Sequence, residues 1–336
     1  MNGYCNISLP QVRSQVSLKA YLAALCILIA HGANAAKLAE TASAPAVWVL
    51  VSDQERVPYA RFVDALRNAA RLPQHALLLS APELALQAVD NSRSALPRLA
   101  VAVGTRAAAE LCARNLGVPL LLALIPKPTY DANLGPACQD HVERHSAVFL
   151  DQPLARQAAA ARLALPHYSR AAVLLGPESR HQRAAIAAVL QRANFEPALI
   201  DVERVADVFY ALEHKAAPGT VLLALPDPLV FTARTASHIL LAAYRYRMPV
   251  VGYTESYARA GALLAVFSTP EQMGQHVGEI MTDALHSASV TLPVPQFPKY
   301  FSVTVNRQVA RSLGLTLPTD AELHTQLLYA EEGSHD

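Results

Sequence analysis

Short runs of apolar residues alternate with helical patterns along most of the chain. The first run, residues 46–51, contains no polar position, which is typical of a strand buried on both faces. Strands alternating with helices predict a parallel sheet. In this first part we expect strands at 46–51, 75–79, 99–103 and 118–125, and helices at about 58–71, 82–90 and 106–115.

The same pattern starts again after residues 146–150. Proline and glycine mark nearly every junction between its elements. The chain is therefore predicted to be an α/β protein with two Rossmann-like lobes in tandem, each with a parallel sheet. In the second part we expect strands at 171–175, 197–202, 220–225, 249–253 and 263–267, and helices at 154–165, 180–193, 231–247 and 270–286.

Ligands of such sheets bind beyond the carboxyl ends of the strands, so two facing lobes would form a cleft. Residues 297–305 and a short predicted helix at 308–313 follow the second unit, and we expect them to cross back toward the first lobe. We expect the chain to pass between the two lobes several times, so that these crossovers form a hinge (a multi-crossover hinge). The predicted organisation has lobe 1 at 46–146 plus 306–325, lobe 2 at 147–305, and a loose tail at 326–336.

The N-terminal segment has the layout of a secretory signal peptide. Positive charges at Arg13 and Lys19 precede an apolar run over 20–30, which is too short to span a bilayer comfortably. Small residues follow, and Ala33-Asn34-Ala35 matches a cleavage site. We therefore predict a signal peptide at 1–35 and a periplasmic location.

Two alternatives for this segment stay open. One is an uncleaved anchor, and the other is lipidation at Cys26, although Leu25 stands where lipidation needs a small residue. No later segment is long and apolar enough to cross a membrane, so the mature chain is not expected to span one.

Composition favours a folded protein without a nucleic-acid surface. Apolar residues make up 52% of the chain and charged residues 16%, which allows a sizeable core and argues against disorder. Removing Arg13 and Lys19 from the 28 basic residues leaves 26 against 27 acidic ones, a net charge near −1. This balance predicts no nucleic-acid partner.

Two cysteines, Cys112 and Cys138, follow the predicted cleavage site. An isolated pair in an oxidising compartment often forms a disulfide, which here would close a loop worth about 3 kcal/mol. Alternatively, His141 and His145 are four residues apart and could form a metal site with Cys138. The order of a metalloprotease motif is absent, and we expect no metal and no cofactor.

No catalytic pattern is recognisable. The chain has no nucleophile elbow, phosphate-binding loop or dinucleotide fingerprint, and its acidic residues form no acid–base pair by spacing. We therefore predict that it is not an enzyme, with an exported hydrolase as a weaker reading.

Polar residues at the ends of predicted strands are candidates for ligand binding. Gly104-Thr105 opens a helix, where backbone N–H groups and a hydroxyl can hold a carboxylate, or simply cap the helix. Asp227 could pair with a ligand ammonium or form a turn before Pro228. Tyr253 could offer a ring face and a hydrogen bond. The predicted ligand-binding set is Ser52, Gln54, Gly104, Thr105, Asp227, Tyr253, Glu255 and Ser256.

Four stretches resemble the substrate-binding proteins of ABC transporters that have the type I periplasmic fold, some of which bind aromatic amino acids. The first is Val103-Gly104-Thr105 with the alanines that follow, and the second is Leu225-Pro226-Asp227-Pro228. The third is 248–256 with 260–262, and the fourth, the most specific, is the Asn, Ala, Leu-Gly and Pro pattern of 305–318. The resemblance covers about 46–318.

The chain departs from these relatives at two turns of the expected cleft. Residues 125–130 replace an Asp-Pro turn, and Asp227-Pro228 stands where the family often has Asp-Asn. The resemblance implies a type I periplasmic binding fold, a small-molecule ligand held between the lobes, and an ABC permease as partner.

Together these features predict a monomeric, extracytoplasmic solute-binding protein of an ABC-type uptake system. It would close by hinge motion on a small polar or amino-acid-like ligand. The two altered turns motivate an alternative: an envelope protein-interaction or sensing module on the same fold that has lost delivery of a small ligand.

Overall fold

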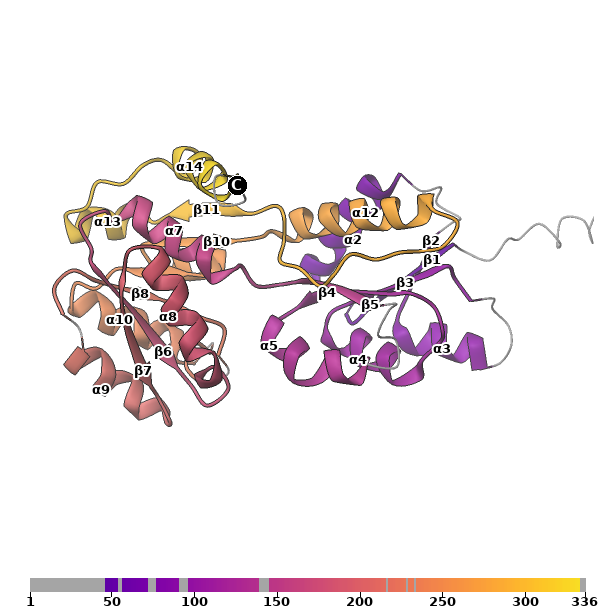
Figure 1. Ribbon diagram of the computed structural model, residues 1–336, viewed down its shortest axis with the longest axis horizontal. Helices are drawn as coiled ribbons and strands as arrows, with labels where there is room; N and C mark the ends of the chain where they lie inside the picture. The colour runs from indigo at the N-terminus through magenta and orange to yellow at the C-terminus, as the bar shows by residue number, and fades with distance from the viewer. Residues whose placement is uncertain are drawn as a thin grey trace, which may run out of the picture. The chain divides into compact units, whose positions relative to one another are not determined.

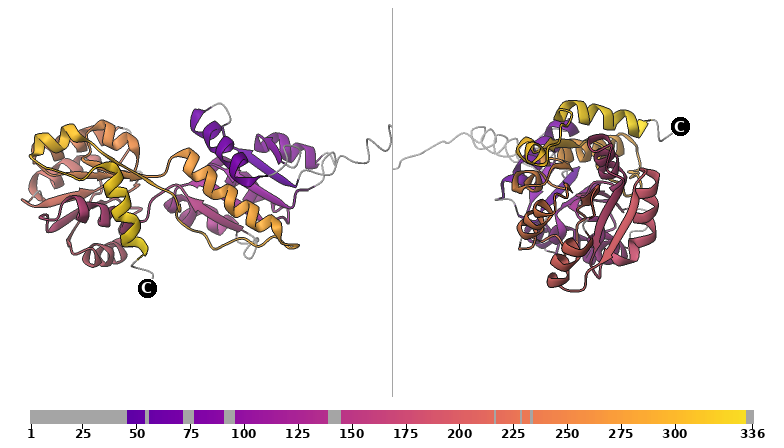
Figure 2. Two further views of the ribbon diagram at one scale, coloured as in Figure 1. Left: turned by 90° about the horizontal axis from the view of Figure 1, so that it is seen from above. Right: turned by 90° about the vertical axis from the view of Figure 1, so that its left-hand side faces the viewer.

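The computed structural model describes residues 46–53, 56–71, 77–90, 96–138, 145–215, 217–227, 229–232 and 234–332. The predicted signal peptide at 1–35, including Cys26, lies outside these residues. The described chain forms two α/β lobes, each with its own sheet covered by helices on both faces (Figures 1 and 2). The two-lobed α/β architecture predicted from the sequence is thus confirmed.

Lobe 1 has a five-stranded parallel sheet in the order β2-β1-β3-β4-β5. Alternate residues of a strand point to opposite faces, so Val47 and Val49 pack on one side and Trp48 and Leu50 on the other. All four are completely buried, which explains the unbroken apolar run. The elements are β1 (Val47–Val51), α2 (Val57–Ala70), β2 (Leu77–Ser80), α3 (Pro82–Asp90), β3 (Leu99–Val103), α4 (Thr105–Arg114), β4 (Leu120–Ile125), α5 (Lys127–Thr129), η2 (Tyr130–Leu134), α6 (Gly135–Ala137) and β5 (His145–Phe149).

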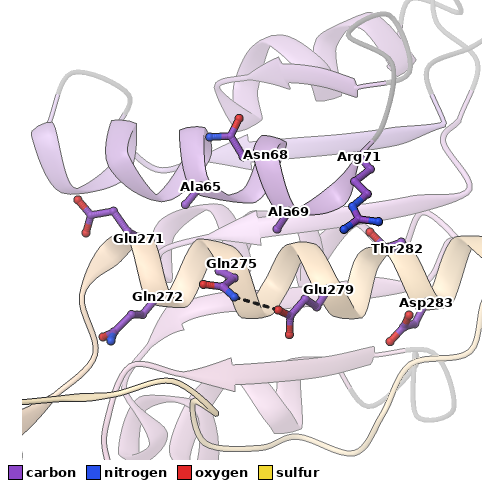
Figure 3. A pocket seen from close by; sticks show the side chains of 10 residues that line it. All are labelled: Ala65, Asn68, Ala69, Arg71, Glu271, Gln272, Gln275, Glu279, Thr282 and Asp283. Atoms are coloured by element: carbon purple, nitrogen blue, oxygen red, sulfur yellow. Dashed lines mark hydrogen bonds between the residues drawn. The ribbon is translucent and has the colours of Figure 1, made fainter.

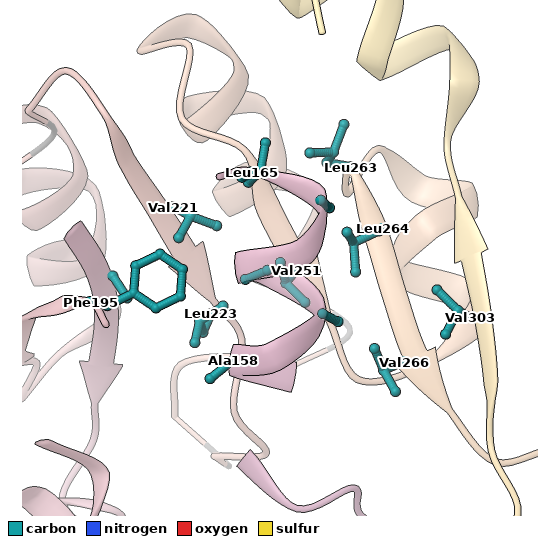
Figure 4. Packing of buried hydrophobic residues seen from close by; sticks show 14 of the residues in the cluster. Ala158, Leu165, Phe195, Val221, Leu223, Val251, Leu263, Leu264, Val266 and Val303 are labelled. Carbon is teal, nitrogen blue, oxygen red and sulfur yellow. The ribbon is translucent and has the colours of Figure 1, made fainter. Parts of the chain in front are cut away.

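Lobe 2 has a six-stranded sheet in the order β11-β10-β9-β8-β6-β7, in which β11 alone runs antiparallel to its neighbour. One face packs against α7 around Leu165, Val221, Leu223 and Leu264 (Figure 4). The elements are α7 (Leu154–Ala164), β6 (Arg170–Leu175), η4 (Arg180–Gln182), α8 (Arg183–Arg192), β7 (Glu196–Asp201), α9 (Val205–Lys215), β8 (Thr220–Leu223), α10 (Ala236–Arg245), β9 (Val250–Gly252), α11 (Glu255–Ala260), β10 (Leu264–Phe267), β11 (Ser302–Val305), α13 (Arg307–Leu313) and α14 (Asp320–Glu332). Between β10 and β11 the chain forms α12 (Pro270–His286), which belongs to lobe 1.

Helix α12 follows β10 of lobe 2 but packs against α2 of lobe 1 (Figure 1). Its Met273 and Val277 are completely buried in the core under β1 and β3. Gly274 and Gly278 allow the close approach, because a Cβ atom on Gly278 would lie 2.8 Å from the carbonyl oxygen of Leu66. The prediction that residues 147–305 all belong to lobe 2 is therefore corrected for α12.

The C-terminal segment belongs to lobe 2, and this corrects the prediction that 306–325 joins lobe 1. Strand β11 pairs with β10, and the apolar side chains of α13 and α14 complete the core beside α7. The predicted loose tail at 326–336 is corrected over residues 326–332, since α14 continues to Glu332 and Leu327 is completely buried, while 333–336 lie outside the described residues. Helical spacing brings Leu323 and Leu327 to one face of α14, and the core requires both.

Cys112 of α4 forms a disulfide with Cys138, with 4.7 Å between the Cα atoms. Both residues are buried in the core of lobe 1. Two histidines were considered with Cys138 as metal ligands. His141 lies outside the described residues, and His145 begins β5, where its Nε2 lies 3.0 Å from the Tyr130 hydroxyl. Among the described residues, no helix combines the length and apolar character needed to span a membrane.

We predict that Gly274→Ala destabilises the protein by about 1–3 kcal/mol, as overpacking does. The added methyl group would overlap the carbonyl oxygen of Phe62, and backbone cannot move aside like a flexible side chain. This clash outweighs the gain of up to about 1 kcal/mol that alanine gives in an open helix. Urea unfolding measures the difference.

Gln275→Ala is the matched control, because Gln275 is an exposed neighbour on the same helix. Its free energy of unfolding should change by less than about 0.5 kcal/mol. Equal stabilities of the Gly274 and Gln275 variants would show that α12 and α2 are not in close contact in solution.

Candidate functional site

The predicted site residues of lobe 1 mainly organise the start of α4. The Ser52 hydroxyl accepts a hydrogen bond of 2.9 Å from the backbone N–H of Ala107, so this part of the helix N-terminus already has a partner. Gly104 has a φ of 90°, and a Cβ there would lie 2.7 Å from the hydroxyls of Ser52 and Tyr59. Thr105 is exposed, and Gln54 lies outside the described residues.

Asp227 is 4% exposed and has its hydrogen-bond partners within lobe 2. Its carboxylate accepts from the Ser179 hydroxyl at 2.7 Å and from the backbone N–H groups of Leu229 and Val230 at 2.9 and 3.1 Å. It also lies where a side chain at Gly176 would be. These contacts fix the turn after β8.

The third predicted group follows β9. The Tyr253 hydroxyl donates to the carbonyl oxygen of Phe231 at 3.3 Å, and its ring lies 4.9 Å from that of Tyr257. Burial raises the pKa of Tyr253 well above its usual value, so the hydroxyl stays protonated. Glu255 is paired with Arg259 at 2.6 Å on the surface of α11, and the Ser256 hydroxyl accepts from Arg259 at 3.4 Å.

A cavity of about 340 Å³ lies where the segments after β4, β5, β6 and β8 come together. Its volume falls in the range of small-molecule sites, and most of its wall is apolar. None of the seven predicted ligand-binding residues that the structure describes lines it. Those that do are Lys127, Pro128, Asp151, Gln152, Pro153, Leu154, Ala155, Ser179, Gln182, Ala185, Ile186, Val189, Leu225, Pro226 and Phe297.

Asp151 is the carboxylate in this wall, and it is 8% exposed. Burial raises its pKa to about 6, and a hydrogen bond from the backbone N–H of Lys127 offsets part of that effect. The Lys127 ammonium instead contacts Asp131 at 2.6 Å. Sequence reasoning missed Asp151, although an acidic residue two positions after the buried strand β5 was an available signal.

A bulge near the end of β4 accompanies this contact. The register of β4 on β5 shifts between Ala123 and Ile125, and the intervening Leu124 has a φ of 55°. A leucine in the left-handed region is strained, which is common next to binding sites. The chain then begins a short helix at Lys127, whose N–H group meets Asp151. This is the turn at 125–130 that departs from the family pattern.

Three segments connect the lobes and together form the hinge: 150–153 between β5 and α7, 268–269 between β10 and α12, and 287–301 between α12 and β11. A polar network joins them beside the cavity. Gln152 donates to the Ser268 hydroxyl at 2.8 Å, and Ser268 donates to the Tyr300 carbonyl oxygen at 2.5 Å. Arg156, 7% exposed, donates to Gln152 at 2.7 Å and forms a bidentate ion pair with Glu331 of α14. One arginine thus connects the hinge with the last helix of the chain.

A second, larger recess of about 720 Å³ lies on lobe 1 between α2 and α12 (Figure 3). Its wall carries polar side chains such as Asn68, Gln275 and Glu279, the last two joined by a hydrogen bond of 3.1 Å. These polar side chains lie on two exposed helix faces and remain in contact with water. A ligand bound there would therefore bury little apolar surface. The smaller cavity combines apolar walls with a buried charge, which makes it the better ligand site.

The fold and this cavity define a two-lobed α/β protein of the binding-protein class. A family model described as ABC transporter substrate binding protein matches residues 79–324, so the chain belongs to that family. No curated protein matches the chain in sequence.

Three solved structures have a similar fold. A substrate-binding protein with adhesive properties from Clostridium difficile, in its ligand-free open structure, has a TM-score of 0.61 at 16% identity, covering 82% of this chain and 95% of its own. An ABC domain from Streptococcus pneumoniae in complex with L-Trp has a TM-score of 0.56 at 14% identity, covering 84% and 98%. A conserved domain protein from Vibrio cholerae has a TM-score of 0.54 at 18% identity, covering 84% and 98%.

We predict that Asp227→Ala lowers the free energy of unfolding by on the order of 3 kcal/mol, because three buried donors lose a charged acceptor. Asp53→Ala is the control, since Asp53 also follows a strand but pairs with Arg56 at the surface. It should cost less than about 1 kcal/mol. A stable Asp227 variant that had lost ligand affinity would instead place Asp227 in the ligand site.

Proposed function

We propose that this chain is the solute-binding component of an ABC-type uptake system. It acts as a monomer in the periplasm, binds a small polar or amino-acid-like solute, and presents it to an ABC permease. The observation that carries the proposal is the cavity of about 340 Å³ beside the hinge, with its apolar wall and few polar groups. Membership in the substrate-binding family supports the same role.

The composition of the cavity wall supports a closing mechanism. Lys127 and Pro128 follow β4 of lobe 1, whereas Ile186 and Leu225 belong to lobe 2. A solute that touched both groups would bind the closed form more tightly and would shift the population toward it. The S. pneumoniae structure, which holds L-Trp, supports a solute of amino-acid size.

The proposal predicts thermal stabilisation by a solute. Mature protein is heated with a panel of amino acids, amines, short peptides and nucleosides, and the midpoint of unfolding is recorded. A solute present at a hundredfold excess over its Kd should add about 3 kcal/mol to the free energy of unfolding. A panel in which nothing raises the midpoint would contradict the proposal.

A pair of variants locates the binding site. Ala185 on α8 lines the cavity, and its neighbour Ala184 is exposed outside it. Ala185→Trp should fill the cavity and abolish the stabilisation, while Ala184→Trp should retain it. Equal binding by the two variants would place the solute elsewhere.

A second candidate function is an envelope interaction or sensing module. The observation that favours it is a set of exposed apolar side chains on α9 and α10. Leu241 and Tyr244, three residues apart on α10, are 51% and 48% exposed, and Tyr210 of α9 is 63% exposed. Exposed apolar side chains that gather on one helix face often mark a protein contact.

This alternative predicts that envelope cross-linking captures a specific partner, and that Leu241→Ser with Tyr244→Ser loses it. Serine at exposed positions leaves the core intact, so the unfolding midpoint should stay close to that of the wild type. If capture of the partner depends on these two residues, and no solute of the panel raises the unfolding midpoint, the interaction or sensing module would be favoured over the uptake function.

A further inference from the structure

The cavity beside the hinge carries one buried acidic group in a mostly apolar wall. Among its lining residues the charged ones are Asp151 and Lys127, and Asp151 is the more buried. Gln152 is already bonded to Arg156 and Ser268, and the Ser179 hydroxyl donates to Asp227. Asp151 is therefore the strongest polar feature that a solute in this cavity would meet.

The Asp151 carboxylate receives only partial compensation from the protein. The backbone N–H groups of Lys127 and of Asp151 itself donate to it, but the Lys127 ammonium lies 2.6 Å from Asp131 and 5.4 Å from the centre of the Phe149 ring. Within the described part of the chain, Asp151 forms no ion pair. A carboxylate taken out of water is stabilised strongly by a cation, and the open cavity leaves room for one to enter.

We infer that the solute carries an ammonium group on an apolar body, and that Asp151 is the specificity-determining residue that binds this group. The inference rests on the proposed solute-binding function and names the solute class. The ammonium would lie at Asp151, and the apolar body would pack against side chains such as Leu154, Ile186 and Phe297. A neutral or anionic analogue would leave the buried carboxylate without a counter-charge.

Binding should then depend on pH. Three titratable groups face Asp151. Lys127 lowers its pKa, Asp131 raises it, and Tyr253 is close enough for Asp151 to raise the pKa of the tyrosine. With a pKa of about 6, Asp151 is ionised at neutral pH and becomes protonated below that value. An alkylammonium keeps its charge throughout, so its affinity should fall about tenfold at one pH unit below the pKa.

Calorimetric titration with three probes of similar shape tests the inference: phenethylamine, 2-phenylethanol and 3-phenylpropionate. At about pH 7.5 the amine should bind at least tenfold more tightly than the alcohol or the carboxylate. Asp151→Asn should remove that preference, and lowering the wild type to about pH 5 should weaken the amine about tenfold. Asparagine can still accept from Lys127 and carries no buried charge, so the empty variant should melt no lower than the wild type.

Glu178→Gln is the matched control. It removes a carboxylate from the same side of lobe 2, but Glu178 is exposed and does not line this cavity. Its amine affinity should stay within about twofold of the wild type.

The outcomes separate the two claims. Equal binding of amine and alcohol, or an amine affinity unchanged in Asp151→Asn, overturns the inference and leaves the solute-binding function standing. The same holds if none of the three probes binds but an uncharged or anionic solute of the panel does. If no solute of any class binds, the proposed function itself fails.

Discussion

The close contact between α12 and α2 determines how the chain runs through the molecule. Helix α12 follows a strand of lobe 2 yet completes the core of lobe 1. Gly274 and Gly278 allow the backbone of α12 to come close to the backbone of α2. Strand β11 must nevertheless pair with β10 of lobe 2. The chain therefore has to leave lobe 2 for α12 and return for β11. Together with the passage from β5 to α7, this makes three connections between the lobes.

Those connections place polar groups where an α/β protein ordinarily has a ligand. The passage after β5 carries the side chains of Asp151 and Gln152, and the return passage carries the carbonyl oxygen of Pro298, which accepts from Arg156. Gln152 and Arg156 hold the passages together, while Asp151 faces the cavity. Neighbouring residues thus have different contacts: Gln152 and Arg156 connect the passages, and Asp151 lines the cavity.

The strands were predictable because both faces of each sheet are buried, so runs such as 46–51 and 99–103 needed no polar position. Helix α9 was not predicted. The sequence also could not show that α12 packs against α2. Two glycines four residues apart indicate close helix packing, but they do not say against which helix. The predicted site residues do follow strands, yet Ser52 and Asp227 bond to their own lobe. Asp151 was missed because it differs from an ordinary turn residue only in being buried. Its burial depends on the residues that pack around it in the fold, and the local sequence does not show them.

The ion pair between Arg156 and Glu331 joins residues 175 positions apart. Lobe 1 likewise needs α12, and lobe 2 needs β11 and α14, before either core is complete. A chain that emerges from its N-terminus usually folds one domain at a time. Here neither lobe can be finished until almost the entire polypeptide has appeared, so the two lobes must reach their native state nearly together, and an unfinished chain exposes the apolar faces of both.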